Sequence, residues 1–218
     1  MRFIFGKLLP ALFGLLVAVG VSAQLLSASH EAFLKKDYDV AFREANKEAK
    51  RGERSAWSLL GLMYKDGLGA PQDYQAAAYW FQKASDKGDT FAQYELSRMY
   101  ASGTGVPENK EKAATLLERP ADTGFLLAIY DIGVAYRFGV GVKADYVVAH
   151  KWLNIAASYP EVDALAPVVQ QARLMRTELE PLMTPAQVRE AQALATTWHL
   201  AKKARNEVLL GNSGKKIK

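Results

Sequence analysis

The sequence contains no cysteine. This absence excludes a disulfide framework, a thiol nucleophile, a cysteine-ligated zinc or iron–sulfur site and a lipid-modified cysteine at the amino terminus. Histidine is also scarce: His30, His150 and His199 lie in different segments, and none belongs to a His-x-x-x-His pair. We therefore expect no metal, no cofactor and no disulfides.

Apolar stretches long enough to enter a membrane are scarce, and the candidate lies at the amino end. It follows two cations, runs from Leu8 to Val21 and ends in small residues up to Ala23. Residues 1–23 therefore predict a signal peptide cleaved after Ala23, and a periplasmic or secreted protein. A retained anchor is the alternative, although the 16 residues from Leu8 to Ala23 fall short of the ~20 that a spanning helix needs. After cleavage we expect no stable membrane span.

Excess positive charge is confined to the carboxyl end. The whole chain has a net charge of +5, but residues 24–200 hold 20 cations and 22 anions, a net charge of −2. The surplus lies in residues 201–218, where six cations accompany Glu207. We expect residues 207–218 to form a basic flexible tail. Because the body has no basic groove interleaved with aromatic residues, we expect no nucleic-acid partner.

A period of 36 residues organises the body of the chain. The same residue type recurs at this interval in several columns, with no insertion between copies. The columns are Gly67, Gly103 and Gly139; Gly69, Gly105 and Gly141; Tyr64, Tyr100 and Tyr136; Ala56, Ala92 and Ala128; and Ala41, Ala77, Ala113 and Ala149. Such a period indicates stacked copies of one supersecondary unit.

Each unit has the pattern of a helical hairpin. In the second unit Asp73 is a suitable N-cap, and Ala77, Phe81 and Ala84 follow at helical spacing. Gly88 then allows a turn into a second helix. Because a single hairpin cannot bury its own apolar face, neighbouring hairpins must stack. Residues 24–158 therefore predict an all-α solenoid.

Two details of the packing can be predicted. Trp80 and Trp152 share a column, as do the three tyrosines, so we expect these aromatic side chains in the core. Trp57 has unlike column mates and is less clearly structural. Pro120 lies where the repeat pattern predicts alanine, as at Ala84, and we expect it to end its helix early.

The repeat motif resembles a known family. The run Met-Tyr-x-x-Gly-x-Gly that begins at Met63 recurs at Met99, and it is followed by Asp73, Tyr74, Ala77, Trp80, Phe81, Ala84 and Gly88. This pattern is similar to the Sel-one-like repeat, a relative of the tetratricopeptide repeat, over approximately residues 37–158. The resemblance implies a right-handed α/α solenoid that binds other proteins, often exported in bacteria and often without enzymatic activity. It further implies that some exported relatives are cysteine-rich and bind β-lactams or peptidoglycan, a branch from which the absence of cysteine separates this chain.

Residues 159–206 predict helices that cap the solenoid. One is expected over residues 162–180 and another from Thr184 to about Arg205. Thr184, Pro185 and Gln187 have the types preferred at the N-cap, first and third helical positions. The apolar residues expected to cover the last hairpin are Val188, Ala191, Ala193, Leu194 and Trp198.

Patterns that carry chemistry are not found, and we assign no catalytic residue. The Gly67-Leu68-Gly69-Ala70 loop and its copies each follow a helix and lack a Gly-Lys-Ser/Thr ending, so helix termination explains them better than phosphate binding. We therefore expect a protein that is not an enzyme.

Columns that change between adjacent copies are free to contact solvent or a ligand. On the first helix of each hairpin two such columns lie side by side: Tyr79, Thr115 and Lys151; and Gln82, Glu118 and Asn154. In related solenoids this helix lines the concave surface, so these six residues form a candidate partner-binding strip. Plain solvated surface is the alternative for each of them.

The expected function is that of an exported adaptor of the bacterial cell envelope, which binds a protein segment or an envelope component on the solenoid groove. A peptidoglycan-binding protein or envelope hydrolase is the first alternative, and a secreted effector is the second. The hypotheses differ in the expected ligand. An adaptor would bind a protein from an envelope extract, whereas the first alternative would bind or cleave purified peptidoglycan. The effector would be found in the culture medium.

Overall fold

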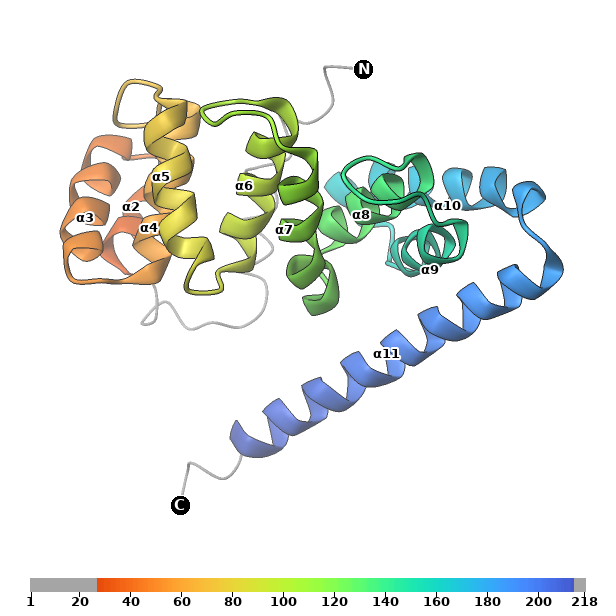
Figure 1. Ribbon diagram of the computed structural model, residues 1–218. Helices are drawn as coiled ribbons and strands as arrows, with labels where there is room; N and C mark the ends of the chain where they lie inside the picture. Colours follow the sequence, from red (N-terminus) through yellow and green to blue (C-terminus); the bar gives the residue numbers. More distant parts are fainter. Residues whose placement is uncertain (1–26, 214–218) are drawn as a thin grey trace.

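The computed structural model describes residues 27–213, and Figure 1 shows that helices make up this part of the chain, with no strand in the described range. The expected signal segment, residues 1–23, and the last residues of the expected tail, 214–218, lie outside the described residues. None of the helices within residues 27–213 is both long enough and apolar enough to cross a bilayer.

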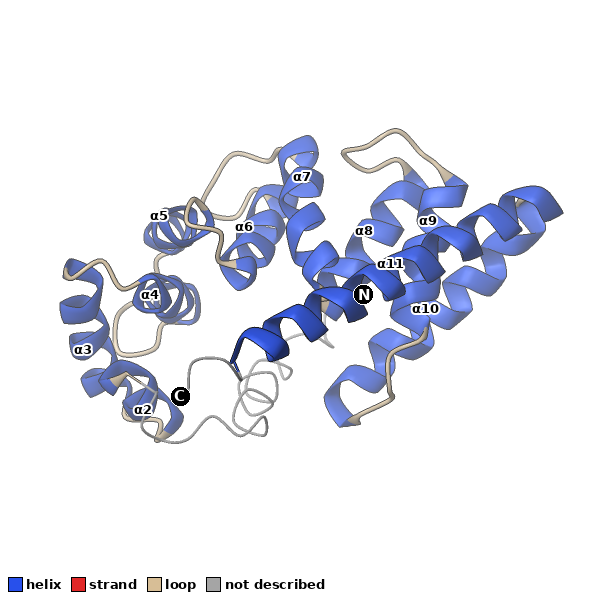
Figure 2. Ribbon diagram, turned by 90° about the horizontal axis from the view of Figure 1, so that it is seen from below, coloured by secondary structure: helices blue, strands red, loops and turns tan. Residues whose placement is uncertain are grey.

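Four consecutive hairpins form the body. They pair α3 (Tyr38–Lys50) with α4 (Arg54–Asp66), α5 (Tyr74–Ser85) with α6 (Thr90–Ser102), α7 (Lys110–Thr123) with α8 (Leu126–Phe138), and α9 (Tyr146–Ala157) with α10 (Ala166–Leu179). The 36-residue period predicted the first three and the first helix of the fourth, whereas the second helix of the fourth lies in the segment expected to cap the solenoid. The short α2 (Ala28–Leu34) precedes them and α11 (Pro185–Ser213) follows. From α2 to α10 each helix packs against the next in the chain, and α11 packs back on α9, so the prediction of an all-α solenoid of hairpins is confirmed (Figures 1 and 2).

The predicted helix caps are present. The side chain of Asp73 accepts hydrogen bonds from the backbone N–H groups of Gln75 and Ala76, both at 2.9 Å. The residues of the same column, Asp37, Asn109 and Asp145, cap α3, α7 and α9 in the same way. These bonds satisfy N–H groups that the first turn of a helix leaves unpaired.

A glycine makes the joint between successive hairpins. Gly105 has φ +72°, and a Cβ placed on it would overlap the backbone carbonyl oxygen of Tyr74. Gly69 and Gly141 have the same backbone conformation, and a Cβ on either would overlap the backbone carbonyl of Tyr38 or Lys110, respectively. A side chain is therefore excluded twice, by the left-handed backbone and by the neighbouring carbonyl.

The alanine columns form the narrow centre of the stack. Ala41, Ala77 and Ala149 are fully buried, and the larger Phe81 beside them is fully buried as well. Gly61 of α4 lies under the Phe81 ring, since a Cβ there would come within 2.6 Å of the ring. Small residues thus let α4 and α5 approach closely around one aromatic ring.

Of the aromatic side chains predicted in the core, Trp152 is buried as expected, but the prediction was wrong for Trp80 and for the tyrosine column. Trp80 is only half-buried at the edge of the core. The tyrosines of the column are also only half-buried against the core: Tyr64, Tyr100 and Tyr136. Trp57 is buried, with 8% of its surface exposed, and its indole N–H donates to the carbonyl of Ala49 at 3.2 Å. Phe81, the next residue after Trp80, takes the central position instead.

Two predicted helix ends were wrong. Pro120 does not end its helix, because α7 continues to Thr123 and stops at Gly124, which has φ 95°. Proline removes one hydrogen bond of the last turn, while its buried ring packs in the core. The last helix, α11, runs to Ser213 rather than about Arg205, since no glycine or proline interrupts the chain before Gly211.

Helix α11 begins at the predicted capping box. The N–H of Thr184 donates to the side chain of Gln187 at 2.8 Å, and the N–H of Gln187 donates to the hydroxyl of Thr184 at 3.3 Å. The helix packs against α9, with Ala191 and Trp198 buried as expected. Ala193 and Leu194, also expected to cover the last hairpin, instead lie on the exposed side of α11.

Candidate functional site

The first helices of the hairpins, α3, α5, α7 and α9, share a face on which equivalent positions recur every 36 residues. We call it the first-helix face. Its central residues are Trp80 and Lys83 on α5, Leu116 and Arg119 on α7, and Trp152 and Ile155 on α9.

At its carboxyl end this face is covered by α11. The ring of Trp198 meets that of Trp152 edge to face, with centroids 6.3 Å apart. Lys202 donates to the Tyr159 hydroxyl at 2.9 Å, and Arg205 donates to the carbonyl of Asp122 at the end of α7, at 3.0 Å. Ile155 is fully buried in the same cluster. The face therefore accepts a helix that brings an aromatic side chain and cations.

On α5 the equivalent positions form an aromatic group around one cation. The Nζ of Lys83 lies 4.9 Å from the ring centroid of Trp57, 5.0 Å from that of Trp80 and 5.6 Å from that of Tyr79. Tyr79 is 58% exposed and contacts Trp80 edge to face. Helix α5 packs on α4 and α6. Trp80 and Lys83 occupy the positions of α5 that are equivalent to Trp152 and Ile155, the residues of α9 that lie under α11.

On α7 the same face carries Leu116, which is half-buried, and Arg119, which is exposed. Among residues 27–213, neither Lys83 nor Arg119 forms an ion pair. Cations, aromatic rings and an aliphatic side chain are thus presented together along α5 and α7. This composition suits recognition of a protein segment, because aromatic residues and arginine dominate the energetics of protein interfaces.

The structure places the six residues of the predicted strip in different situations. Tyr79, Thr115 and Glu118 are exposed, as a binding strip requires. Gln82 is half-buried and donates to Asp86 at 2.6 Å. The last two are engaged within the protein: Asn154 accepts from Arg176 of α10 at 2.9 Å, and the Nζ of Lys151 lies 3.8 Å from the ring centroid of Trp152.

Lys151 is half-buried, and its surroundings change its pKa. Burial lowers the pKa of its ammonium group, and the negative charge of Asp122 acts in the opposite direction. The structure thus leaves Tyr79, Thr115 and Glu118 exposed on α5 and α7, whereas the two members on α9 contact other side chains of the protein. Sequence reasoning missed Trp80, Lys83 and Arg119, although two adjacent columns of large or cationic side chains pointed to them.

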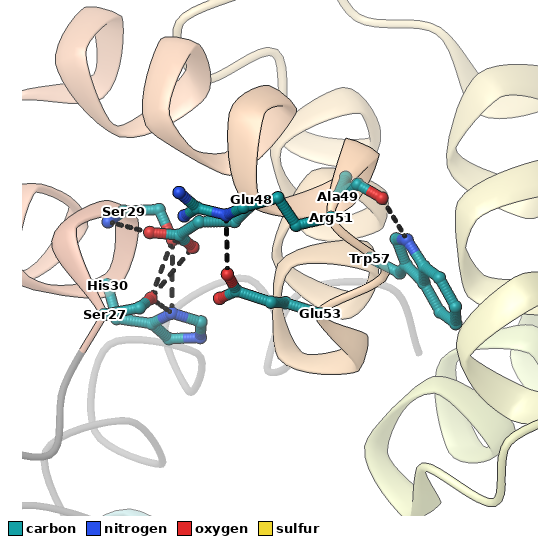
Figure 3. A network of polar contacts seen from close by, with 8 residues as sticks. All are labelled: Ser27, Ser29, His30, Glu48, Ala49, Arg51, Glu53 and Trp57. Carbon is teal, nitrogen blue, oxygen red and sulfur yellow. Dashed lines mark hydrogen bonds and ion pairs between the residues drawn. The ribbon is translucent and has the colours of Figure 1, made fainter.

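At the amino end, Ser27, Ser29, His30 and Glu48 form a cluster of the residue types found in hydrolase active sites (Figure 3). The hydrogen bonds of this cluster are those of a helix cap. The carboxylate of Glu48 accepts from the hydroxyls of Ser27 and Ser29 and from the backbone N–H of Ser29. Burial raises the pKa of Glu48, but these hydrogen bonds outweigh it and the net pKa is lowered. Ser29 is fully buried, so this group fastens the start of α2 to α3.

Two further pairs of ionisable groups form contacts between helices. His150 is fully buried, with Nε2 3.2 Å from a carboxylate oxygen of Glu180. Lys65 of α4 donates to the buried Glu95 of α6 at 2.8 Å. Within residues 27–213 no three histidine, aspartate or glutamate side chains converge as a metal site would require.

The carboxyl group of Asp131, on α8, has a raised pKa. Burial raises its pKa to about 6, while the charge of Arg98 and a hydrogen bond with Tyr94 act in the opposite direction. Tyr94 and Arg98 both lie on α6. The group therefore joins two adjacent hairpins.

The Sel1 repeat family model matches residues 58–89, 90–122 and 126–158. A solved protective antigen present in uropathogenic Escherichia coli strains, with an SLR fold, superposes with a TM-score of 0.62 and 28% sequence identity. The match covers 73% of this chain but only 32% of that one, so this chain spans about a third of the antigen's length. A Sel1 repeat protein from Oxalobacter formigenes shares the fold, with a TM-score of 0.59, 24% identity and 70% coverage of each chain. No curated protein matches the chain in sequence.

Proposed function

This chain is a Sel1 repeat protein, and we propose that it is an interaction scaffold that binds a segment of another protein on the first-helix face. Sel1 repeats generally mediate protein–protein interactions, and their solenoids are typically scaffolds rather than enzymes. The proposal assigns the binding surface to α5 and α7, through Tyr79, Trp80 and Lys83 on the first and Thr115, Glu118 and Arg119 on the second.

The packing of α11 against α9 is the main observation that supports this proposal. Trp198 and Ala195 of α11 share a buried cluster with Trp152 and Ile155, so one copy of the repeat already holds a helix on this face. Trp80, one of the equivalent residues on α5, is half-buried beside the exposed ring of Tyr79. A partner segment with an apolar or aromatic anchor would bury this edge as α11 buries Trp152.

A photo-crosslinking amino acid at Tyr79 tests the binding surface in living cells. We expect a crosslinked adduct with a specific protein, and loss of an adduct formed from Thr115 when Trp80 and Lys83 are both changed to alanine. Phe138, at the end of α8, is the matched control because it is also 58% exposed. Equal adducts from Tyr79 and Phe138, or none from Tyr79, would contradict the proposal.

The proposed place of action is outside the cytoplasm, in the periplasm or after secretion. The cationic start, apolar centre and small residues of positions 1–23 support this location. Amino-terminal sequencing of the protein recovered from fractionated cells should begin at Gln24. A chain that keeps Met1 and remains in the cytoplasmic fraction would refute export.

The same preparations separate the scaffold from an envelope hydrolase or a peptidoglycan-binding protein. Incubation with purified peptidoglycan should leave the protein in the supernatant and the peptidoglycan uncleaved. Sedimentation with peptidoglycan that persists after Trp80→Ala and Lys83→Ala would replace the scaffold with a peptidoglycan-binding function. Accumulation of the mature chain in the culture medium would favour a released effector.

A further inference from the structure

Helix α11 has two unlike faces. Toward α9 it buries Ala191, Ala195 and Trp198. On the opposite side, apolar side chains lie in solvent, and Leu200 is 63% and Val208 62% exposed. We call this the outer stripe, which consists of Ala193, Thr197, Leu200, Ala204 and Val208.

The outer stripe has the spacing of a helix-pairing seam. Its members follow one another at intervals of 4, 3, 4 and 4 residues, which keeps them on one side of a helix. The hydroxyl of Thr197 donates to the carbonyl of Ala193 in its own helix at 2.9 Å, so the stripe presents no unpaired hydroxyl there. The alanines allow another helix to approach closely.

The distal part of α11 lacks support from the hairpins. Among the described residues, the hydrogen bond from Arg205 to Asp122 is the last from α11 to the rest of the protein. The helix nevertheless continues to Ser213, and Figure 1 shows it running away from the hairpins. Short helical segments without tertiary contacts are marginal in water, so a partner helix would stabilise this one.

We propose that a second copy of this chain covers the outer stripe, with the two α11 helices antiparallel. The stripe from Ala193 to Ala204 is complementary to itself about a point between Trp198 and His199, while Val208 then lies opposite the partner's Arg189. Reversal about that point pairs Ala193 with the partner's Ala204, and Thr197 with the partner's Leu200. A surface that matches its own reversed copy is what a two-fold symmetric dimer requires.

Two exposed charges favour the antiparallel arrangement. Arg189 and Glu207 are both exposed, and neither forms an ion pair among residues 27–213. They are 18 residues apart, about five helical turns, and therefore lie along the same edge of α11. Antiparallel pairing brings this edge of α11 against the same edge of the partner, so Arg189 lies near the partner's Glu207 at both ends of the contact.

The dimer should be reversible. A contact between single helices is smaller than the ~1,600 Å² of total surface that a standard stable interface buries. The average mass measured by sedimentation velocity should therefore rise from one chain toward two as the concentration of the purified protein increases. This measurement needs no other partner protein. The dimer can therefore be refuted while the scaffold function is supported, and the scaffold function can be refuted while the dimer is observed.

Leu200→Glu should keep the protein monomeric at concentrations where the unchanged protein is dimeric. Because Leu200 lies outside the core, its variant should retain the melting temperature and the fluorescence of the buried Trp198. Gln192→Glu is the matched control, since it adds the same charge to an exposed position of α11 outside the outer stripe, and it should dimerise normally.

Charge exchange tests the direction of the helices. Arg189→Glu and Glu207→Arg should each weaken the dimer by about tenfold, and the double exchange should restore it. A monomer at every concentration, or a dimer that survives Leu200→Glu, would overturn the proposal. Failure of the double exchange would overturn the antiparallel arrangement. Binding of a monomer to phosphatidylglycerol vesicles through Leu200 would assign the stripe to a lipid surface instead.

Discussion

The indole ring of Trp198 on α11 lies edge-on against that of Trp152 on α9, with centroids 6.3 Å apart. This pair joins a helix outside the repeats to the last first helix of the solenoid. It closes the end of the stack, and it also shows what the first-helix face can hold.

Trp198→Ala should detach α11 from the last hairpin. The substitution removes a buried indole and uncovers Trp152, so we expect the free energy of unfolding to fall by about 3 to 5 kcal/mol. Limited proteolysis should then cleave α11 before the hairpins. Leu200→Ala, on the exposed side of the same helix, should change stability by no more than about 0.5 kcal/mol. Equal losses for the two variants would contradict this account of α11.

Phe81→Ala should destabilise the protein more than Trp80→Ala. Phe81 is fully buried against Gly61, so its removal should cost about 3 to 5 kcal/mol in chemical denaturation. Trp80 is half-buried, and its loss should cost clearly less. A larger effect at Trp80 would restore the sequence-based prediction that this column forms the core.

Gly105→Ala should be more damaging than Gly52→Ala. Both glycines have positive φ, which alone costs an alanine about 1 kcal/mol. At Gly105 the new methyl group would also overlap the carbonyl of Tyr74, whereas nothing lies within 4 Å at Gly52. We expect a loss of at least about 2 kcal/mol at Gly105, measured as a change in the denaturation midpoint. Similar denaturation midpoints for the two variants would refute the role of Gly105 in the contact between hairpins.

Asp131→Asn should stabilise the protein above pH 6 and have little effect near pH 4. The folded-state pKa of about 6 exceeds the ordinary value of 3.8, so the folded chain holds a proton that the unfolded chain releases. Stability therefore falls as pH rises from about 4 to about 6, and the asparagine variant escapes that loss, which amounts to roughly 3 kcal/mol.

Comparison of the variant with the unchanged protein at each pH isolates this group from the histidines. Burial lowers the pKa of His30, which makes stability fall as pH decreases and so has the opposite sign. That contribution is the same in both proteins and cancels in the difference. A difference independent of pH would show that Asp131 stays ionised in the folded protein.

The repeat columns predicted the hairpins because local rules and packing agree there. Asp73 caps its helix, Ala77 and Phe81 lie inside, and glycines end the second helices, as the spacing required. The prediction failed where one residue type supports two outcomes. Proline disfavours a helix, yet Pro120 is tolerated in a last turn where its ring is buried.

The candidate strip was harder to predict, because comparison of columns shows which positions vary but not what lies over them. Asn154 varies like Gln82 and Glu118, yet Arg176 of α10 binds it. Trp80 was assigned to the core because it shares a column with Trp152, but Trp152 is buried with α11 against it. Helices outside the repeat create these differences, so the repeat pattern alone contains no information about them.

The glycine joints make the number of hairpins adjustable. At each joint a glycine rests on a backbone carbonyl, and the residue that supplies this carbonyl is tyrosine in two copies and lysine in the third. The contact is made by backbone atoms and does not depend on the side chain at that position. A 36-residue unit added or deleted in register would therefore form the same glycine–carbonyl contact with its neighbour. The reach of the binding face could thus be lengthened or shortened one module at a time while both end caps are kept.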